Sequence, residues 1–265
     1  MCCEDRSGLI HERITLLSNE KVGPRLFVMR VESPRIAQAL LPGQFTHVRI
    51  PQMESHILRR PFSVYETFPE EGTMDILYQV VGYGTEFLSK LPAGTQLDQI
   101  GPIGRPWDAP EGETRVLAVA GGAGAPATFM QVKRCVEAGI PVDVVLGAQN
   151  ANALVTRERY AALLGADPVC ATDDGSYGFK GFATIPAAEL MQENEYSRVI
   201  TCGPEPLMRA VANSAAEAGI ACQVSMERRM ACGVGACLSC VVETVQGKKR
   251  ACVDGPIFEA DQVVW

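Results

Sequence analysis

The first hundred residues carry short runs of hydrophobic and polar positions, separated by Pro/Gly turns. Runs at 25–31, 46–50 and 73–80 predict β-strands, and 41–44 is one of the turns between them. Residues 85–90 predict one short helix. Regular short strands with turns between them are typical of a small antiparallel barrel. We therefore predict an N-terminal antiparallel β-barrel domain over residues 9–108.

After residue 110 the pattern changes to longer alternating units. Residues 115–120 form a continuous hydrophobic run, which is typical of a buried parallel strand. Further strands are predicted at 142–146, 168–172 and 198–202, and helices at 126–138, 155–164, 185–193 and 204–218. This alternation predicts a doubly wound parallel α/β sheet over residues 109–223, followed by a small C-terminal segment at 224–265. The fold class is therefore α/β plus all-β.

Composition narrows the class of protein. The chain of 265 residues is 47% hydrophobic and 21% charged, which is ordinary for a soluble globular protein. Its net charge of −7 argues against a nucleic-acid partner. It has no apolar run of about 18 residues, as a membrane helix needs, and no basic-then-apolar leader. We expect a cytoplasmic protein without a membrane partner.

The most informative motif is a group of four cysteines near the C-terminus. They are Cys232, Cys237, Cys240 and Cys252, with the spacing C-x4-C-x2-C-x11-C. Three thiolates on a tight loop and a fourth from a following strand are typical of a [2Fe–2S] cluster. Gly233 and Gly235 allow the loop to curl around the inorganic core. We predict that the four cysteines are the metal ligands.

Zinc and disulfides are the alternatives for these cysteines. A structural zinc site usually has two short cysteine knuckles, and here only Cys237 and Cys240 form one. The absence of a leader and the low cysteine density argue against a disulfide framework. Four of the other cysteines are interpreted as small buried hydrophobes: Cys135, Cys170, Cys202 and Cys222.

Two turns of the α/β region indicate a dinucleotide. The glycines Gly121, Gly122 and Gly124 lie between a buried strand and a helix, where a pyrophosphate can approach the backbone. Cys202 and Gly203 end the last strand of that region and suit the nicotinamide end. The alternatives are a tight strand–helix turn and a simple strand terminator before a proline.

The choice of dinucleotide rests on the strand at 142–146. An enzyme for NADP usually has an arginine near the end of this strand, for the 2′-phosphate. The next arginines here are Arg157 and Arg159, inside the following helix. The sequence favours NAD(H).

A flavin is indicated by the barrel region. Arg60 is held by Pro61 and suits a diphosphate, and Ser63 could hydrogen-bond a flavin ring. Gly84 and Thr85, at the start of a helix, form a second anion-binding turn. The alternative is a solvated Arg-Pro turn.

In order along the chain, these motifs resemble the electron-transfer subunit of class 1B (NAD-linked) dihydroorotate dehydrogenase, in the ferredoxin–NADP reductase superfamily. The resemblance covers nearly the whole chain and is carried by the segments 42–45, 60–63, 78–80, 84–85, 101–104, 172–176, 202–204 and 226–237. It implies that FAD is bound by Arg60, Pro61, Phe62, Ser63, Tyr78, Gln79, Val80, Gly84 and Thr85. It also implies NAD(H) on the second domain and the cluster on the four cysteines.

The resemblance further implies a partner. This would be a catalytic subunit with FMN that oxidises dihydroorotate to orotate in pyrimidine biosynthesis, in a heterotetramer with two copies of each subunit. The reaction would be an electron relay without acid–base residues, and the three histidines are interpreted as structural or exposed. A reductase subunit of a sulfide dehydrogenase, hydrogenase or bifurcating transhydrogenase, and a zinc-structured nucleotide sensor, are the alternatives.

The chain departs from the family pattern at two places. Pro126 stands one position earlier than the family's proline in the nucleotide turn. Arg105 and Pro106 replace the usual Asn-Gly, and we expect this change to alter contacts at the flavin.

Overall fold

The computed structural model describes residues 8–53 and 56–265, so Cys2, Cys3 and the leader prediction lie outside the described residues. The N-terminal sheet is antiparallel, with the strand order β4-β3-β7-β1-β2-β6-β5. Its strands are β1 (Ile10–Gly23), β2 (Leu26–Glu32), β3 (Phe45–Arg49), β4 (Arg60–Ser63), β5 (Glu66–Phe68), β6 (Thr73–Gln79) and β7 (Gln96–Ile103). The short helices are α1 (Pro34–Ala39) and α2 (Tyr83–Leu88).

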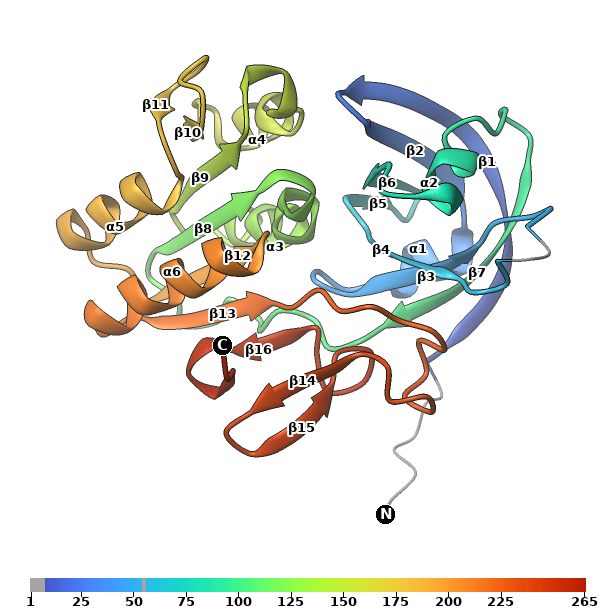
Figure 1. Ribbon diagram of the computed structural model, residues 1–265. Coiled ribbons are helices and arrows are strands. Elements are labelled where there is room, and N and C mark those ends of the chain that lie inside the picture. Colours follow the sequence, from blue (N-terminus) through green and yellow to red (C-terminus); the bar gives the residue numbers. More distant parts are fainter. Residues whose placement is uncertain (1–7, 54–55) are drawn as a thin grey trace.

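The N-terminal sheet curls around its own hydrophobic core but is a half-barrel (Figure 1). Among the described strands, β4 and β5 are the edges of the sheet and do not pair with each other. Alternate residues of β1, such as Ile14 and Leu16, are fully buried, as expected for strands with one face on a core. The predicted antiparallel architecture is therefore confirmed in an open form.

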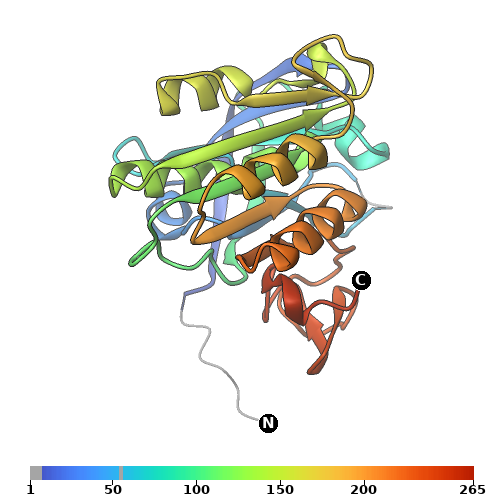
Figure 2. The same ribbon diagram turned by 90° about the vertical axis from the view of Figure 1, so that its left-hand side faces the viewer.

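The second sheet has the order β11-β10-β9-β8-β12-β13-β16. Its parallel strands are β8 (Val116–Gly121), β9 (Val142–Ala148), β10 (Val169–Thr172), β11 (Phe179–Lys180), β12 (Arg198–Cys202) and β13 (Ala221–Ser225). The helices α3 (Ala125–Glu137) and α4 (Arg157–Leu164) pack on the face toward the half-barrel. The helices α5 (Thr184–Glu193) and α6 (Glu205–Glu217) cover the other face (Figure 2). The prediction of a doubly wound α/β sheet is confirmed. No helix of the described residues is long and apolar enough to span a bilayer.

The C-terminal segment contributes to the second sheet. It forms the hairpin β14 (Val241–Thr244) and β15 (Gly247–Arg250), and then β16 (Ile257–Glu259) pairs antiparallel with β13. The strand β13, absent from the predicted elements, continues to Ser225 across the predicted division at residue 224. The domain limits 9–108, 109–223 and 224–265 therefore stay predictions, because the last two units share one sheet.

The three units pack as one body (Figure 1). One hydrophobic cluster joins Phe45 of the half-barrel to Cys240 and Cys252 of the C-terminal segment and to residues of α5 and α6. A second cluster joins Tyr65 of the half-barrel to α3 and α4. These shared cores fix the flavin region, the α/β sheet and the cysteine loop relative to one another.

Candidate functional site

The predicted flavin motif places an arginine against a helix start. Arg60 begins the edge strand β4, and Gly84 lies in the first turn of α2. A Cβ atom on Gly84 would come within 2.7 Å of Arg60 Nε and Nη2. Only glycine therefore permits this packing, which sets a cation beside the backbone N–H groups of a helix terminus. The structure brings Arg60 and Gly84 together in one corner, and anion binding there stays a prediction.

Other residues assigned to the flavin are engaged within the chain. The Thr85 hydroxyl accepts hydrogen bonds from the N–H groups of Val81 and Gly82, so it shapes the turn. The Tyr78 side chain is buried in the half-barrel core, and its hydroxyl donates to Asn19 Oδ1 at 2.9 Å. Phe62 is buried in the same core. These side chains therefore shape the turn and the core next to Arg60 and Gly84.

The remaining flavin residues lie on strand backbones. Pro61 and Ser63 on β4 are paired with residues of β3, while Gln79 at the end of β6 is exposed. The Val80 N–H donates to the Arg25 carbonyl at 2.8 Å. Of this group, Ser63 and Gln79 keep side chains that no hydrogen bond of the described residues occupies.

The two predicted dinucleotide turns meet at the carboxyl edge of the parallel sheet. Because β8 and β12 are neighbours, the turn after each strand lies beside the other. A Cβ atom on Gly124 would lie 2.7 Å from both the N and the Cα atoms of Gly203. Gly203 has φ of +154° and packs on the backbone of Gly121. Close backbone contact of this kind at the carboxyl edge is typical of a dinucleotide crevice.

The side chains around this crevice suit a neutral ribose better than a phosphate. Arg159 is ion-paired to Asp75 of β6, and Arg157 stacks on Tyr177 and contacts Asp167. Both arginines considered for a 2′-phosphate are therefore already paired. The Cys202 thiol is buried, and its pKa is raised by burial and by the Glu227 carboxylate. This agrees with its interpretation as a small hydrophobe, as does the burial of Cys135, Cys170 and Cys222.

The backbone of the cysteine loop stabilises negative charge on one sulfur atom, Cys232 Sγ. Cys232 Sγ accepts hydrogen bonds from the backbone N–H groups of Val234 and Cys237, both at 3.4 Å. Burial opposes the charge of this thiolate, but the backbone N–H groups outweigh burial and lower the pKa of Cys232 to about 7. A loop that donates to sulfur in this way suits an iron–sulfur cluster.

The other two cysteines lie deeper and beside each other. Cys240 and Cys252 are buried, and their thiols interact. Burial and the neighbouring Cys240 raise the pKa of Cys252 to about 12. Among the described residues no group of three or more His, Cys, Asp or Glu gathers tightly enough for a single ion. The spacing of the four cysteines remains the basis for expecting a [2Fe–2S] cluster and not a mononuclear zinc site.

One functional neighbour of the loop is not evident from the sequence. His47 on β3 is fully buried and packs on Gly233, directly after Cys232. It also stands opposite Pro61 in the β3–β4 register. Burial lowers the pKa of His47 to about 4, and the charges of Arg59 and Arg60 act in the same direction. The sequence gives no sign of this position, because only tertiary packing brings His47 to the cysteine loop and to the β4 strand.

The segment after Gly104 contacts the cysteine segment. The Arg105 N–H donates to the Gly255 carbonyl at 2.6 Å, and a Cβ atom on Gly104 would come within 2.4 Å of Pro256. Arg105 thus joins the half-barrel to the cysteine segment, and the expected effect of Arg105 and Pro106 on flavin contacts stays a prediction. Pro126 lies in the first turn of α3, a position that tolerates proline.

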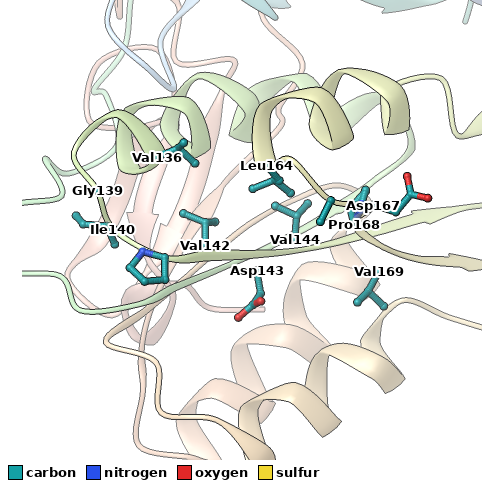
Figure 3. Close-up of a pocket in the computed structure, with 12 residues that line it drawn as sticks. Val136, Gly139, Ile140, Val142, Asp143, Val144, Leu164, Asp167, Pro168 and Val169 are labelled. Carbon is teal, nitrogen blue, oxygen red and sulfur yellow. The ribbon is translucent and has the colours of Figure 1, made fainter.

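Two hollows lie at different ends of the molecule. One, of about 410 Å³, lies at the amino ends of β9 and β10, opposite the dinucleotide edge. Figure 3 shows Val142 and Val144 pointing into it toward α3 and α4, while Asp143 points to the other face of β9. A second, of about 390 Å³, lies between the half-barrel and the cysteine loop and is lined in part by Gln44, Gly233 and Cys252. Only the second adjoins a predicted cofactor site.

Comparisons with known proteins agree with this geometry. The iron–sulfur cluster binding domain of dihydroorotate dehydrogenase B matches residues 227–264, and the oxidoreductase FAD-binding domain matches residues 13–107. Similar proteins include dihydroorotate dehydrogenase B (NAD(+)), electron transfer subunit, from Desulforamulus reducens, 38% identical over 252 residues, or 92% of this chain and 94% of that protein. The protein of the same name from Bacillus pumilus is 34% identical over 258 residues, or 94% and 96%.

Solved structures show the same architecture. A chain of the NADH-dependent reduced ferredoxin-NADP oxidoreductase, studied for flavin-based electron bifurcation, is 31% identical with a TM-score of 0.86, and the match covers 95% of this chain and 89% of that one. The ferredoxin reductase of carbazole 1,9a-dioxygenase, at 19% identity, a TM-score of 0.64 and coverage of 80% and 67%, shares the fold. The chain therefore belongs to the family of the electron transfer subunits of NAD-dependent dihydroorotate dehydrogenase B.

Proposed function

We propose that this chain relays electrons between NAD(H), FAD and a [2Fe–2S] cluster, to or from an FMN-containing subunit that interconverts dihydroorotate and orotate in pyrimidine biosynthesis. The observation that carries this proposal is the packing of the cysteine loop on the flavin-binding half-barrel. Gly233 lies against His47, which stands opposite Pro61 of the flavin strand. One chain thus sets the two predicted cofactor sites side by side.

Each cofactor has a proposed set of residues. Arg60 and Gly84 would receive the diphosphate of FAD, while Ser63 and the backbone of β4 and β6 would orient the ring system. The touching glycine turns Gly124 and Gly203 would receive NAD(H). The cluster would be held by Cys232, Cys237, Cys240 and Cys252. Bound FAD supplies the step between a two-electron hydride donor and a one-electron cluster.

The protein's own part is binding and orientation. The chain sets the glycine turns of the sheet and the arginine corner of the half-barrel at fixed positions, because the shared cores join them. The backbone N–H groups around Cys232 Sγ stabilise negative charge on sulfur. No side chain is assigned a proton transfer.

The assembly and its location are part of the proposal. We propose a heterotetramer with two copies of this chain and two of the catalytic subunit, located in the cytoplasm. The family name, electron transfer subunit, supports a catalytic partner. The exposed Cys237 and Leu238 lie at the surface of the cysteine loop, where an acceptor could approach.

Reconstitution tests this function. The chain is co-expressed with an FMN-containing dihydroorotate dehydrogenase catalytic subunit, and iron, sulfide and both flavins are counted in the purified complex. Dihydroorotate and NAD(+) should then yield NADH, and the catalytic subunit alone should not. Zinc without iron or sulfide, or a complex that turns over dihydroorotate without reducing NAD(+), would contradict the relay.

A second function is favoured by one structural match. The NADH-dependent reduced ferredoxin-NADP oxidoreductase chain covers 95% of this chain at 31% identity. A reductase subunit of a bifurcating transhydrogenase is therefore the alternative. In that case the chain would couple NADH to ferredoxin and NADP(+) with a different partner, and would not support dihydroorotate-dependent NADH formation.

A further inference from the structure

The buried imidazole of His47 forms no well-aligned hydrogen bond in the described part of the chain. Its side chain is fully buried, and both Nδ1 and Nε2 are unpaired. A neutral imidazole carries one N–H donor and one acceptor nitrogen. Leaving a buried polar group unsatisfied is unfavourable, because the group loses its hydrogen bonds to water. Such a residue inside an otherwise well-packed strand therefore points to a partner outside the polypeptide.

The strand geometry aims this imidazole at the cysteine loop. Residues alternate between the two faces of β3, so Thr46 and Val48 face one side and Phe45 and His47 the other. Val48 belongs to the half-barrel core, whereas Phe45 packs in the cluster that contains Cys240 and Cys252. His47 accordingly shares the face of β3 that covers the cysteine segment.

The contact with the loop is close and specific to one nitrogen. A Cβ atom on Gly233 would lie 2.5 Å from His47 Nδ1 and 3.2 Å from its Cε1, so the imidazole edge rests on the Gly233 backbone. Gly233 has φ of +67°, a conformation that glycine adopts without strain. The residue before it, Cys232, is a proposed ligand, and its backbone also interacts with the ring.

The charged groups that act on the ring do not supply an acceptor. Arg59 and Arg60 are the charged residues that act on His47, and guanidinium groups can only donate. Pro61, the register partner of His47 on β4, has no N–H. The backbone carbonyl of Cys232 lies near the ring but accepts no well-aligned hydrogen bond from it, so an N–H of His47 remains available to donate to a negatively polarised acceptor on the side of the cysteine loop. Thiolate and sulfide sulfur are acceptors of that kind.

We propose that His47 is a positioning residue for the [2Fe–2S] cluster, which packs on Gly233 and donates an imidazole N–H to a sulfur atom on the Cys232 side of the bound cluster. This inference rests on the proposed function, because it needs the cluster. A hydrogen bond to sulfur stabilises the more negative, reduced cluster and so raises its reduction potential. His47 would thereby tune the cluster from the strand next to the flavin motif.

Spectroscopy of the intact, cluster-loaded complex tests the inference directly. The protein is produced with nitrogen-15-labelled histidine, and the reduced cluster is measured by pulsed electron paramagnetic resonance. A nitrogen coupling from a histidine is expected. The chain has only three histidines, so His47→Leu should abolish the coupling. His11→Leu is the matched control, since His11 is exposed and pairs with Asp98, and it should preserve the coupling.

The potential provides a second readout. His47→Leu should lower the equilibrium constant for cluster reduction about tenfold, equivalent to about 59 mV for one electron. His47→Asn keeps an amide near the Nδ1 position and should restore most of the potential, whereas His47→Gln, which reaches the Nε2 position, should not. If His47→Leu loses its iron, the comparison of His47→Asn with His47→Gln still tests whether the imidazole N–H sets the cluster potential.

The outcomes separate this inference from the proposed function. If the native cluster shows no histidine coupling, or if His47→Leu keeps both its iron and the native potential, His47 does not bind sulfur and the inference is overturned. NADH formation from dihydroorotate would be normal in that case. If the coupling is present but the complex does not turn over dihydroorotate, the proposed partner is wrong and the role of His47 stands.

Discussion

Arg159 on α4 donates to Asp75 Oδ2 on β6 at 2.6 Å, across the junction of the two large sheets. The Asp75 carboxylate is buried and also accepts from Arg30 Nε at 2.7 Å. Glu66 extends this network, because it contacts Arg159 and accepts from Lys133 of α3 at 2.8 Å. The buried Asp75 and the nearby Glu66 therefore both connect the half-barrel to the helices of the dinucleotide sheet.

Removing the charge of Asp75 should destabilise the junction. In Asp75→Asn, two guanidinium groups, 37% and 36% exposed, lose the charge of their buried partner, and a hydrogen bond to a charged group contributes about 1.5–3 kcal/mol. We expect the free energy of unfolding, measured by urea titration of the FAD-loaded chain, to fall by about 2 kcal/mol. Lys90→Gln breaks the exposed pair with Glu86 and should cost less than about 1 kcal/mol. Equal losses in the two variants would mean that the junction does not depend on Asp75.

A methyl group on Gly84 should weaken FAD binding without weakening the fold. The Cβ atom of Gly84→Ala would displace the end of the Arg60 side chain, from which it would lie 2.7 Å. Alanine within a helix is more favourable than glycine by about 1 kcal/mol, so the free energy of unfolding of the FAD-free protein should not fall. We expect FAD affinity, measured by fluorescence titration, to drop about tenfold, as for the loss of one charge-assisted hydrogen bond.

A double-mutant cycle shows whether this effect passes through Arg60. Arg60→Ala alone should also lower FAD affinity, and adding Gly84→Ala should then change little, because the group that alanine displaces is gone. If the losses of FAD affinity in the two single variants add up in the double variant, then Gly84→Ala acts on FAD binding independently of Arg60.

The carboxylate of Asp98 should give the half-barrel a pH dependence. Burial opposes the charge of Asp98, but hydrogen bonds from His11 and Arg59 outweigh burial and hold the pKa of Asp98 below its ordinary 3.8. Its stabilisation is therefore complete above pH 3.8 and is lost as the pH falls through the lowered folded-state value. The stability difference between the native chain and Asp98→Asn should vanish over that acid range in urea titrations. A difference that stays constant with pH would contradict the assignment.

Local pattern explains how far the fold could be predicted. The apolar run that became β8 and the alternation of strands and helices after it are local patterns, and the predicted limits of β8 and of the four helices agree with the structure to within two residues. The strand β13 contains the polar but buried Gln223 and Ser225, which hide its hydrophobic pattern. The strand β16 joins the sheet by pairing with β13, which lies more than thirty residues earlier in the chain. Such long-range pairing has no local sequence signal.

The candidate site likewise contains residues that the sequence predicts and residues that only the tertiary structure reveals. The spacing of the four cysteines and the glycine turns indicates cofactors, because those patterns are local. His47 carries no such signal, since a single histidine in a strand is usually structural, and its role depends on the packing of β3 against the cysteine loop. The ion pair of Arg159 with Asp75 is equally invisible in sequence, although it explains why that arginine is not free for a phosphate.

Alanine at Gly124 should impair the use of NAD(H) and spare the flavin. Its Cβ atom would lie 2.7 Å from backbone atoms of Gly203, so the two turns must move apart. We expect kcat/KM for NADH with a soluble electron acceptor to fall by at least about tenfold, with FAD content unchanged. Gly165→Ala is the control for backbone strain alone, because Gly165 at the end of α4 has φ of +70°, whereas Gly124 has φ of −79°, and no atom lies within 4 Å of the Gly165 Cβ position. A similar loss of activity in both variants would indicate general strain.

Replacing Cys237 by serine should remove the cluster and stop electron delivery to the partner. Cys237 is the exposed one of the four proposed ligands, and its own N–H also donates to Cys232 Sγ, so the substitution keeps the loop backbone while it removes one thiolate. Iron and acid-labile sulfide should be lost, while FAD and its reduction by NADH remain, because the arginine corner and the glycine turns lie on other elements. Ser239→Ala, in the same loop, loses only a weak contact with the Arg229 carbonyl at 3.4 Å and should keep the cluster. Cluster absorption and partner reduction at native levels in Cys237→Ser would overturn the ligand assignment, since a [2Fe–2S] cluster held by four thiolates does not tolerate the loss of one without a change in its spectrum.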